Sequence, residues 1–166
     1  MTGLERRRPA VFLQHGLIDS ADTWILNGPS HSPAFMLANS GYDVFLGNSR
    51  GNYYSRKHIR LSPKEKAFWD YTWVDMGRKD IPKMVEYALK LSKVEKLTYI
   101  GHSQGTTQMF VALSENSDWW ASKINCFVAL GPVTKTSKCK SKIIRFLSKT
   151  KGTKALIKLG VKEMFP

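Results

Sequence analysis

Short apolar runs recur along the chain and alternate with segments in which apolar residues are spaced for a helix. Each short run has the length and composition of a buried strand, and a turn residue follows it. The predicted strands are 10–14 (AVFLQ), 42–48 (YDVFLGN), 96–101 (KLTYIG) and 124–131 (INCFVALG).

The segments between these strands predict helices and one long loop. Residues 33–41 (PAFMLANSG) predict a short helix that Gly41 closes, and residues 103–115 (SQGTTQMFVALSE) predict another. Between residues 68 and 91 the apolar positions, among them Trp73, Met76 and Ile81, approximate the spacing of one helix face. Pro82 should kink or restart that helix because it lacks an N–H. The turn-rich residues 48–63 predict a loop. Strands that alternate with helices predict an α/β fold: a mostly parallel sheet with helices on both faces.

Composition bounds the classes of protein to consider. A chain of 166 residues with 42% hydrophobic residues is long enough for one globular domain with a real core. No apolar run approaches the roughly 20 residues of a membrane span, and the first residues lack the apolar stretch of a secretion signal. Cys126 and Cys139 could pair or stay free, but neither has CxxC or metal-ligand spacing, so we expect no redox or metal site.

Positive charge is concentrated at the end of the chain. Residues 135–166 contain ten Lys or Arg against one acid, Glu163, whereas the whole chain has a net charge of +13. In this segment Ile157, Val161 and Phe165 lie four apart, on one face of a predicted helix. Such a helix either packs on the core with a solvated basic face or binds an anionic membrane or a partner. Lysines interleaved with apolar residues suit a membrane better than a nucleic acid, so no nucleic acid is expected.

Residues 101–105 read Gly-His-Ser-Gln-Gly, a match to Gly-x-Ser-x-Gly between a predicted strand and a predicted helix. In that setting Ser103 is the candidate nucleophile on a sharp, strained turn, and Gly101 and Gly105 are the glycines that let strand and helix backbones approach. The helix N-terminus below Ser103 carries partial positive charge, which stabilises a developing oxyanion. The alternative is a tight structural turn with an incidental serine.

A second candidate element, His15-Gly16-Leu17, directly follows the first predicted strand. Acyl transfer requires two backbone N–H donors directed at the tetrahedral oxyanion, one of them from the residue after the nucleophile. The candidate oxyanion hole is therefore the amides of Leu17 and Gln104, with Gly16 allowing close approach of the loop.

Five stretches occur in an order that closely resembles the acid lipase family (lysosomal acid lipase and gastric lipase type) of the α/β-hydrolase fold. They are VFLQHGLIDSADTW, GYDVFLGNSRGNYYSRKH, FWDYTWVDMGRKDIP, YIGHSQGTT and FVALGPV. The resemblance implies a lipase, a carboxylic ester hydrolase that cleaves triacylglycerols or sterol esters with a Ser–His–Asp triad and no cofactor. It also implies Ser103 as nucleophile, Leu17 and Gln104 as the oxyanion hole, and a structural role for residues 47–52 (GNSRGN).

The same resemblance implies an incomplete α/β-hydrolase core. Residues 1–134 would be a partial core, truncated at both ends, with its four strands side by side, and residues 135–166 would begin the cap or lid. Full-length relatives are secreted or lysosomal, but the location of this chain is left open.

A catalytic base is not found where the family keeps it. In this fold the triad follows the order Ser, then Asp or Glu, then His, and no histidine follows Ser103. His15, His31, His58 and His102 all precede it and are expected to be packing or surface residues. Since loss of a triad member costs about 10⁴–10⁶ in kcat, this chain alone is expected to be nearly inert.

Two other functions remain open from the residues. One is a non-catalytic lipid- or partner-binding module that keeps the fold. The other is an electrostatic binder in which residues 135–166 contact an anionic membrane surface. A different hydrolase of the same fold, such as a thioesterase, fits the motif but not the wider resemblance.

Overall fold

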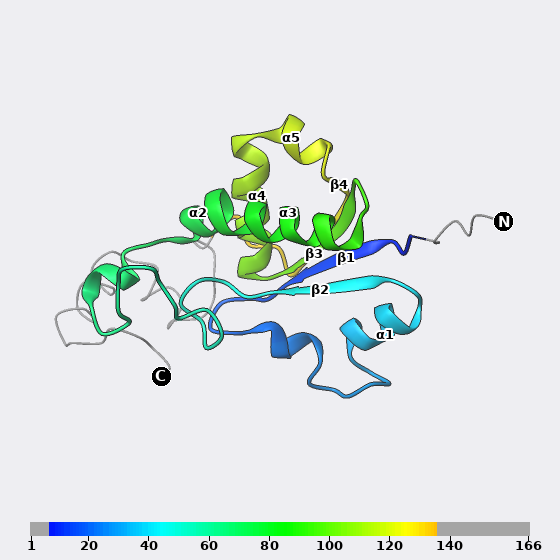
Figure 1. The fold of residues 1–166 in the computed structure, drawn as a ribbon, viewed down its shortest axis with the longest axis horizontal. Coiled ribbons are helices and arrows are strands. Elements are labelled where there is room, and N and C mark those ends of the chain that lie inside the picture. Colours follow the sequence, from blue (N-terminus) through cyan, green and yellow to red (C-terminus); the bar gives the residue numbers. More distant parts are fainter. Residues whose placement is uncertain (1–6, 136–166) are drawn as a thin grey trace.

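The computed structural model describes residues 7–135 and contains one parallel sheet of four strands in the order β2-β1-β3-β4. Figure 1 shows the strands side by side, with the helices in layers on either side. The strands are β1 (Ala10–Gln14), β2 (Asp43–Gly47), β3 (Leu97–His102) and β4 (Ile124–Leu130). The four predicted strands and their parallel arrangement are confirmed, with ends that differ by at most one residue.

Helices cover both faces of the sheet, as predicted. Helices α2, α3, α4 and α5 lie together on one side of it, and α1 lies on the other (Figure 1). The helical elements are η1 (Ala21–Trp24), α1 (Pro33–Asn39), η2 (Lys66–Trp69), α2 (Trp73–Asp75), η3 (Met76–Asp80), α3 (Ile81–Ser92), α4 (Gln104–Glu115) and α5 (Ser117–Ala121).

The two cores follow from the alternation of side chains along β1. Ala10 and Phe12 join the core under α3, α4 and α5, where the Phe12 ring stacks on Tyr99 with centroids 5.7 Å apart. Val11 and Leu13 point to the other face and join the core under η1 and α1. Because both faces of β1 are covered, all five of its residues are buried.

The predicted helix at 68–91 is instead a series of three helical segments, α2, η3 and α3, that begins at Trp73. A π-helical turn, η3, runs directly into α3, whose second residue is Pro82, a residue with no N–H to donate. The wider turn places Met76 and Ile81, five residues apart, both in the core, with Ile81 N–H bonded to Met76 O. Trp73 lies before this turn and is 53% exposed rather than on the buried face.

Three elements were not predicted from the sequence: η1, η2 and α5. All three are shorter than two helical turns, too short for an apolar period to be visible. Residues 136–166, which include most of the basic segment and its predicted helix, lie outside the described residues. None of the helices within 7–135 is long and apolar enough to cross a membrane.

Candidate active site

Ser103 lies at the junction of β3 and α4 with φ 50° and ψ −115°. A non-glycine residue in this region is strained by about 1–3 kcal/mol and persists only when its surroundings hold it. Here the Ser103 N–H donates to Leu130 O at 2.9 Å, and Ser103 O accepts from Thr106 Oγ1 at 2.6 Å. The backbone is thus bound both to the end of β4 and to the first turn of α4, with the side chain half-buried.

Gly101 and Gly105 lie where the backbones cross most closely. A Cβ on Gly101 would be 2.9 Å from the carbonyl oxygen of Gly105, and a Cβ on Gly105 would be 2.6 Å from the carbonyl oxygen of Gln14. The buried Tyr99 hydroxyl donates to Gly105 O at 3.0 Å from below, and burial raises the pKa of Tyr99 well above its usual value. The turn therefore has room for glycine alone at both positions.

The loop after β1 runs directly against this turn. A Cβ built on Gly16 would lie 3.2 Å from the Cβ of Ser103, so the next peptide, which carries the Leu17 N–H, lies beside the nucleophile. Within residues 7–135, neither the Leu17 N–H nor the Gln104 N–H donates to an acceptor. The backbone at Ile18 has φ 51°, a strained value for a β-branched residue. Two unpaired donors next to a strained serine form the arrangement that stabilises an oxyanion.

His15 is buried and hydrogen-bonded on both sides of its ring. Nδ1 lies 2.8 Å from Gly16 O, Nε2 accepts from the Ser49 N–H at 3.0 Å, and the Asn52 side-chain nitrogen lies 3.2 Å from Nε2. Burial, the largest cause, lowers the pKa of His15, although the Gly16 carbonyl and Asp19 act in the opposite direction. This ring therefore stays neutral at pH 7 and is not directed at Ser103 as a base.

A buried polar cluster connects the loop after β2 with β1 and α4. Ser49 Oγ accepts from the side-chain amides of Gln14 and Gln108, each at 3.0 Å. The family resemblance implies a structural role for residues 47–52 but does not indicate these partners. The signal present in the sequence was Gln14 itself, a polar residue at the end of an otherwise apolar strand.

Of the other histidines, His102 directly precedes the candidate nucleophile in the chain, and His31 and His58 belong to loops. His102 is exposed at the end of β3, the exposed His31 contacts the Ser30 hydroxyl at 2.9 Å, and His58 accepts from the backbone N–H of Arg60 and Leu61. Among the residues that the structure describes, no three His, Cys, Asp or Glu side chains gather as metal ligands would. Cys126 is exposed and unpaired there.

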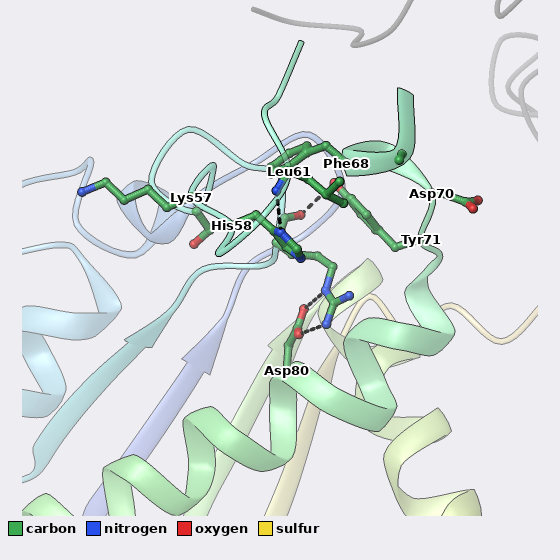
Figure 2. A pocket seen from close by; sticks show the side chains of 10 residues that line it. Lys57, His58, Leu61, Phe68, Asp70, Tyr71 and Asp80 are labelled. Atoms are coloured by element: carbon green, nitrogen blue, oxygen red, sulfur yellow. Dashed lines mark hydrogen bonds and ion pairs between the residues drawn. The ribbon is translucent and has the colours of Figure 1, made fainter. Parts of the chain in front are cut away.

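A surface hollow of about 410 Å³ lies among residues 50–71 and η3. Figure 2 shows His58, Phe68 and Tyr71 grouped around it, with Lys57 and Asp70 on opposite sides and the dashed ion pair at Asp80 below. The Arg50 guanidinium forms that pair, with Nε 2.7 Å from Asp80 Oδ2, which raises the pKa of Arg50. None of the five candidate site residues lines this hollow.

Comparison of the sequence with known proteins identifies the family of this chain. Residues 9–153 match the family described as the alpha/beta hydrolase fold. The chain is 51% identical over 127 residues to lipase lipl-1 of Caenorhabditis elegans, covering 76% of this chain and 31% of that protein. It is 53% identical to lipase member K of Mus musculus and 50% identical to gastric triacylglycerol lipase of Rattus norvegicus, covering 76% of this chain in each case and 31% and 32% of those proteins. The chain thus spans about a third of the length of the curated relatives it matches.

Solved structures agree on the fold. A carboxylesterase structure from Nitrososphaera gargenis is similar with a TM-score of 0.54 and 20% identity, over 96% of this chain and 52% of that chain. An epoxide hydrolase from Vigna radiata is similar with a TM-score of 0.52 and 18% identity, over 88% and 39%. The chain belongs to the α/β-hydrolase fold family, and within it is about half identical to gastric triacylglycerol lipase and related lipases.

Proposed function

We propose that this chain carries the nucleophile and oxyanion hole of a lipase, a carboxylic ester hydrolase acting on neutral lipid esters such as triacylglycerols or sterol esters. The observation that carries the proposal is the strained Ser103 beside the N–H groups of Leu17 and Gln104, which have no acceptor among residues 7–135. The names of the relatives, lipases and a gastric triacylglycerol lipase, support the substrate class.

The proposed chemistry is acyl transfer through Ser103. Ser103 Oγ attacks the ester carbonyl carbon while a base takes its proton, and the carbonyl oxygen becomes an oxyanion that accepts from the Leu17 and Gln104 N–H groups. Collapse of this intermediate breaks the bond to the alcohol, which leaves with the proton. Water then attacks the acyl group and releases the acid, so no metal or cofactor enters the cycle.

The proposal includes slow turnover by the 166-residue chain on its own. All four histidines precede Ser103 in the sequence, and His15 has both ring nitrogens engaged away from it. Without a triad base, the oxyanion hole and substrate binding still accelerate the reaction about 10³–10⁴-fold over its rate in water. Ser103 should therefore react with strong electrophiles while ester turnover stays slow.

Labelling with an alkyl fluorophosphonate, followed by intact mass, tests the nucleophile. We expect an adduct on the chain and on Ser114→Ala, and none on Ser103→Ala. Ser114 is the matched control because it is an exposed serine on the same helix, α4. An adduct that persists in Ser103→Ala, or no adduct on the unmodified chain, would overturn the proposal.

Competition tests the substrate class. Emulsified triacylglycerol or sterol ester should slow the labelling of Ser103 more than an equal concentration of a short water-soluble ester. Equal protection by all esters would contradict the assignment to neutral lipids.

The basic segment supports a second candidate function, binding to an anionic membrane surface without catalysis. Ten Lys or Arg lie between residues 135 and 166 against one acid, and each basic residue near an anionic surface adds about 1 kcal/mol. Sedimentation with vesicles should increase with the fraction of anionic lipid and decrease with salt. Sedimentation that is independent of both would exclude this function.

A further inference from the structure

We propose that His15 is a positioning residue that holds the Leu17 N–H in the oxyanion hole through its hydrogen bond to the Gly16 carbonyl. The inference deepens the proposed function and rests on it, because it concerns one of the two donors assigned there. His15 does not touch the reacting atoms in this role.

The peptide between Gly16 and Leu17 links the His15 ring to the Leu17 N–H. The Gly16 carbonyl and the Leu17 N–H belong to the same planar trans peptide and therefore point in opposite directions. His15 Nδ1 lies 2.8 Å from Gly16 O, and this contact is on the buried side, since His15 is only 2% exposed. With its carbonyl held inward by the ring, the peptide directs its N–H outward, on the side where Leu17 is 52% exposed.

The partners of Nε2 fix which ring nitrogen carries the proton. The Ser49 N–H is a backbone donor and points at Nε2 at 3.0 Å, so Nε2 must be the unprotonated acceptor. The remaining proton of the neutral ring is then on Nδ1, where it is available to donate to Gly16 O. Asn52 supplies a second donor toward Nε2 at 3.2 Å. Both donors disfavour an imidazolium, and burial lowers the pKa of His15 in the same direction.

The ring is tied to the helix that carries the other oxyanion donor. Ser49, whose N–H binds His15, accepts through its hydroxyl from Gln108 of α4 and from Gln14 of β1. Gln104 is the first residue of that same helix. One connected set of hydrogen bonds thus fixes the Leu17 loop relative to the Gln104 N–H. A histidine that only filled space in the core would not need these hydrogen bonds.

Two substitutions separate the positioning role from simple packing. In His15→Asn the side-chain amide nitrogen takes the place of Nδ1, so it keeps the donor to Gly16 O but loses the acceptor for Ser49. In His15→Gln the side-chain oxygen takes the place of Nε2, so it keeps the acceptor but loses the donor. Each variant loses one buried hydrogen bond, and both should be destabilised.

The test compares the rate constant for fluorophosphonate labelling of Ser103 with the urea midpoint in each variant. We expect labelling of His15→Gln to slow by about 10–100-fold, within the range for a weakened oxyanion donor, and His15→Asn to remain within about threefold. Trp120→Phe, remote in the core under α5, serves as the control that lowers stability without slowing labelling. Equal slowing in both His15 variants, or slowing that follows stability across all three, would overturn the inference.

A spectroscopic measurement separates this inference from the proposed function. In the ¹⁵N spectrum of the unmodified chain, His15 should show a protonated Nδ1 and an unprotonated Nε2, and the Leu17 amide signal should shift in His15→Gln but not in His15→Asn. If Ser103 does not label but these signals behave as described, the proposed function fails while the positioning of the Leu17 N–H stands. A protonated Nε2, or a Leu17 signal unaffected by His15→Gln, would refute the positioning whatever Ser103 does.

Discussion

Replacing Gly105 by alanine should destabilise the protein, although the same change stabilises an ordinary helix. Gly105 is in the first turn of α4, and Gly→Ala within a helix usually gains about 1 kcal/mol. Here the new Cβ would lie 2.6 Å from Gln14 O and 2.8 Å from His15 O. Both contacts are backbone carbonyls of the central strand and its loop, so α4 must move away from β1. Such overpacking lowers the free energy of unfolding by about 1–3 kcal/mol. We expect about 3 kcal/mol here, because the two closest contacts are backbone atoms and not flexible side chains that could move aside. The net loss is about 2 kcal/mol, or about 4–8 °C in Tm for a chain of this size.

The assay combines urea denaturation with labelling of Ser103 by a fluorophosphonate. Movement of the α4 N-terminus displaces the Gln104 N–H, so labelling should slow by about 10-fold or more. Gly77→Ala is the matched control. Its Cβ would lie 2.6 Å from Gln108 O, in the middle of α4, so it should lower stability without slowing labelling to the same degree. A Gly105→Ala protein as stable as the unmodified chain, or one that labels at the same rate, would refute the reasoning from backbone contacts.

Three further changes have expected outcomes. In urea denaturation, Asp80→Asn should lower the free energy of unfolding by about 1–2 kcal/mol, because it weakens a partly exposed, two-point ion pair with Arg50. Lys83→Gln, which removes an exposed ion pair with Glu86, should lower it by less than about 0.5 kcal/mol. Tyr99→Phe should cost about 1 kcal/mol through loss of the bond to Gly105 O, and an unchanged midpoint would show that this bond contributes nothing. The folded state lowers the pKa of His15 below 6.5, so near this pH the unfolded chain binds a proton that the folded chain does not. The free energy of unfolding should therefore fall as the pH is lowered through and below 6.5. This decrease should be smaller in His15→Gln, which lacks the titrating ring.

The strands could be predicted because each is a short apolar run that the sheet buries on both faces. β1 illustrates this, since its five residues are all buried and serve two cores at once. The region before Pro82 could not be predicted, because the π turn shifts the helical period by one residue between Met76 and Ile81. Helical spacing read through that turn places Trp73 on the buried face, where the structure leaves it exposed.

For the candidate site, the sequence indicated which residues come together but not what holds them there. Ser103, Gly101 and Gly105 follow from one motif in one strand–turn–helix setting. The contacts of His15 with Ser49 and Asn52 span 34 and 37 residues, and no local pattern reports a pairing of that separation. The sequence interpretation placed His15 in the oxyanion loop, whereas the structure adds that both ring nitrogens have partners.

The supports of the site divide into two sets, one from the end of β4 and one from the loops after β1 and β2. From one side, the end of β4 and the residues after it bind the first turn of α4: Leu130 O accepts from Ser103, Val133 N–H donates to Thr106 and Val133 O accepts from Thr107. From the other side, the hydrogen bonds of His15 bind the loop that contains the strained Ile18. Each strained residue would relax by about 1–3 kcal/mol if its own set were lost. Because the two sets share no hydrogen bond, the backbone of Ser103 depends on β4 and the direction of the Leu17 N–H depends on the loop after β2. Changes on the β4 side should therefore alter the position of the nucleophile, and changes on the His15 side should alter the stabilisation of the oxyanion.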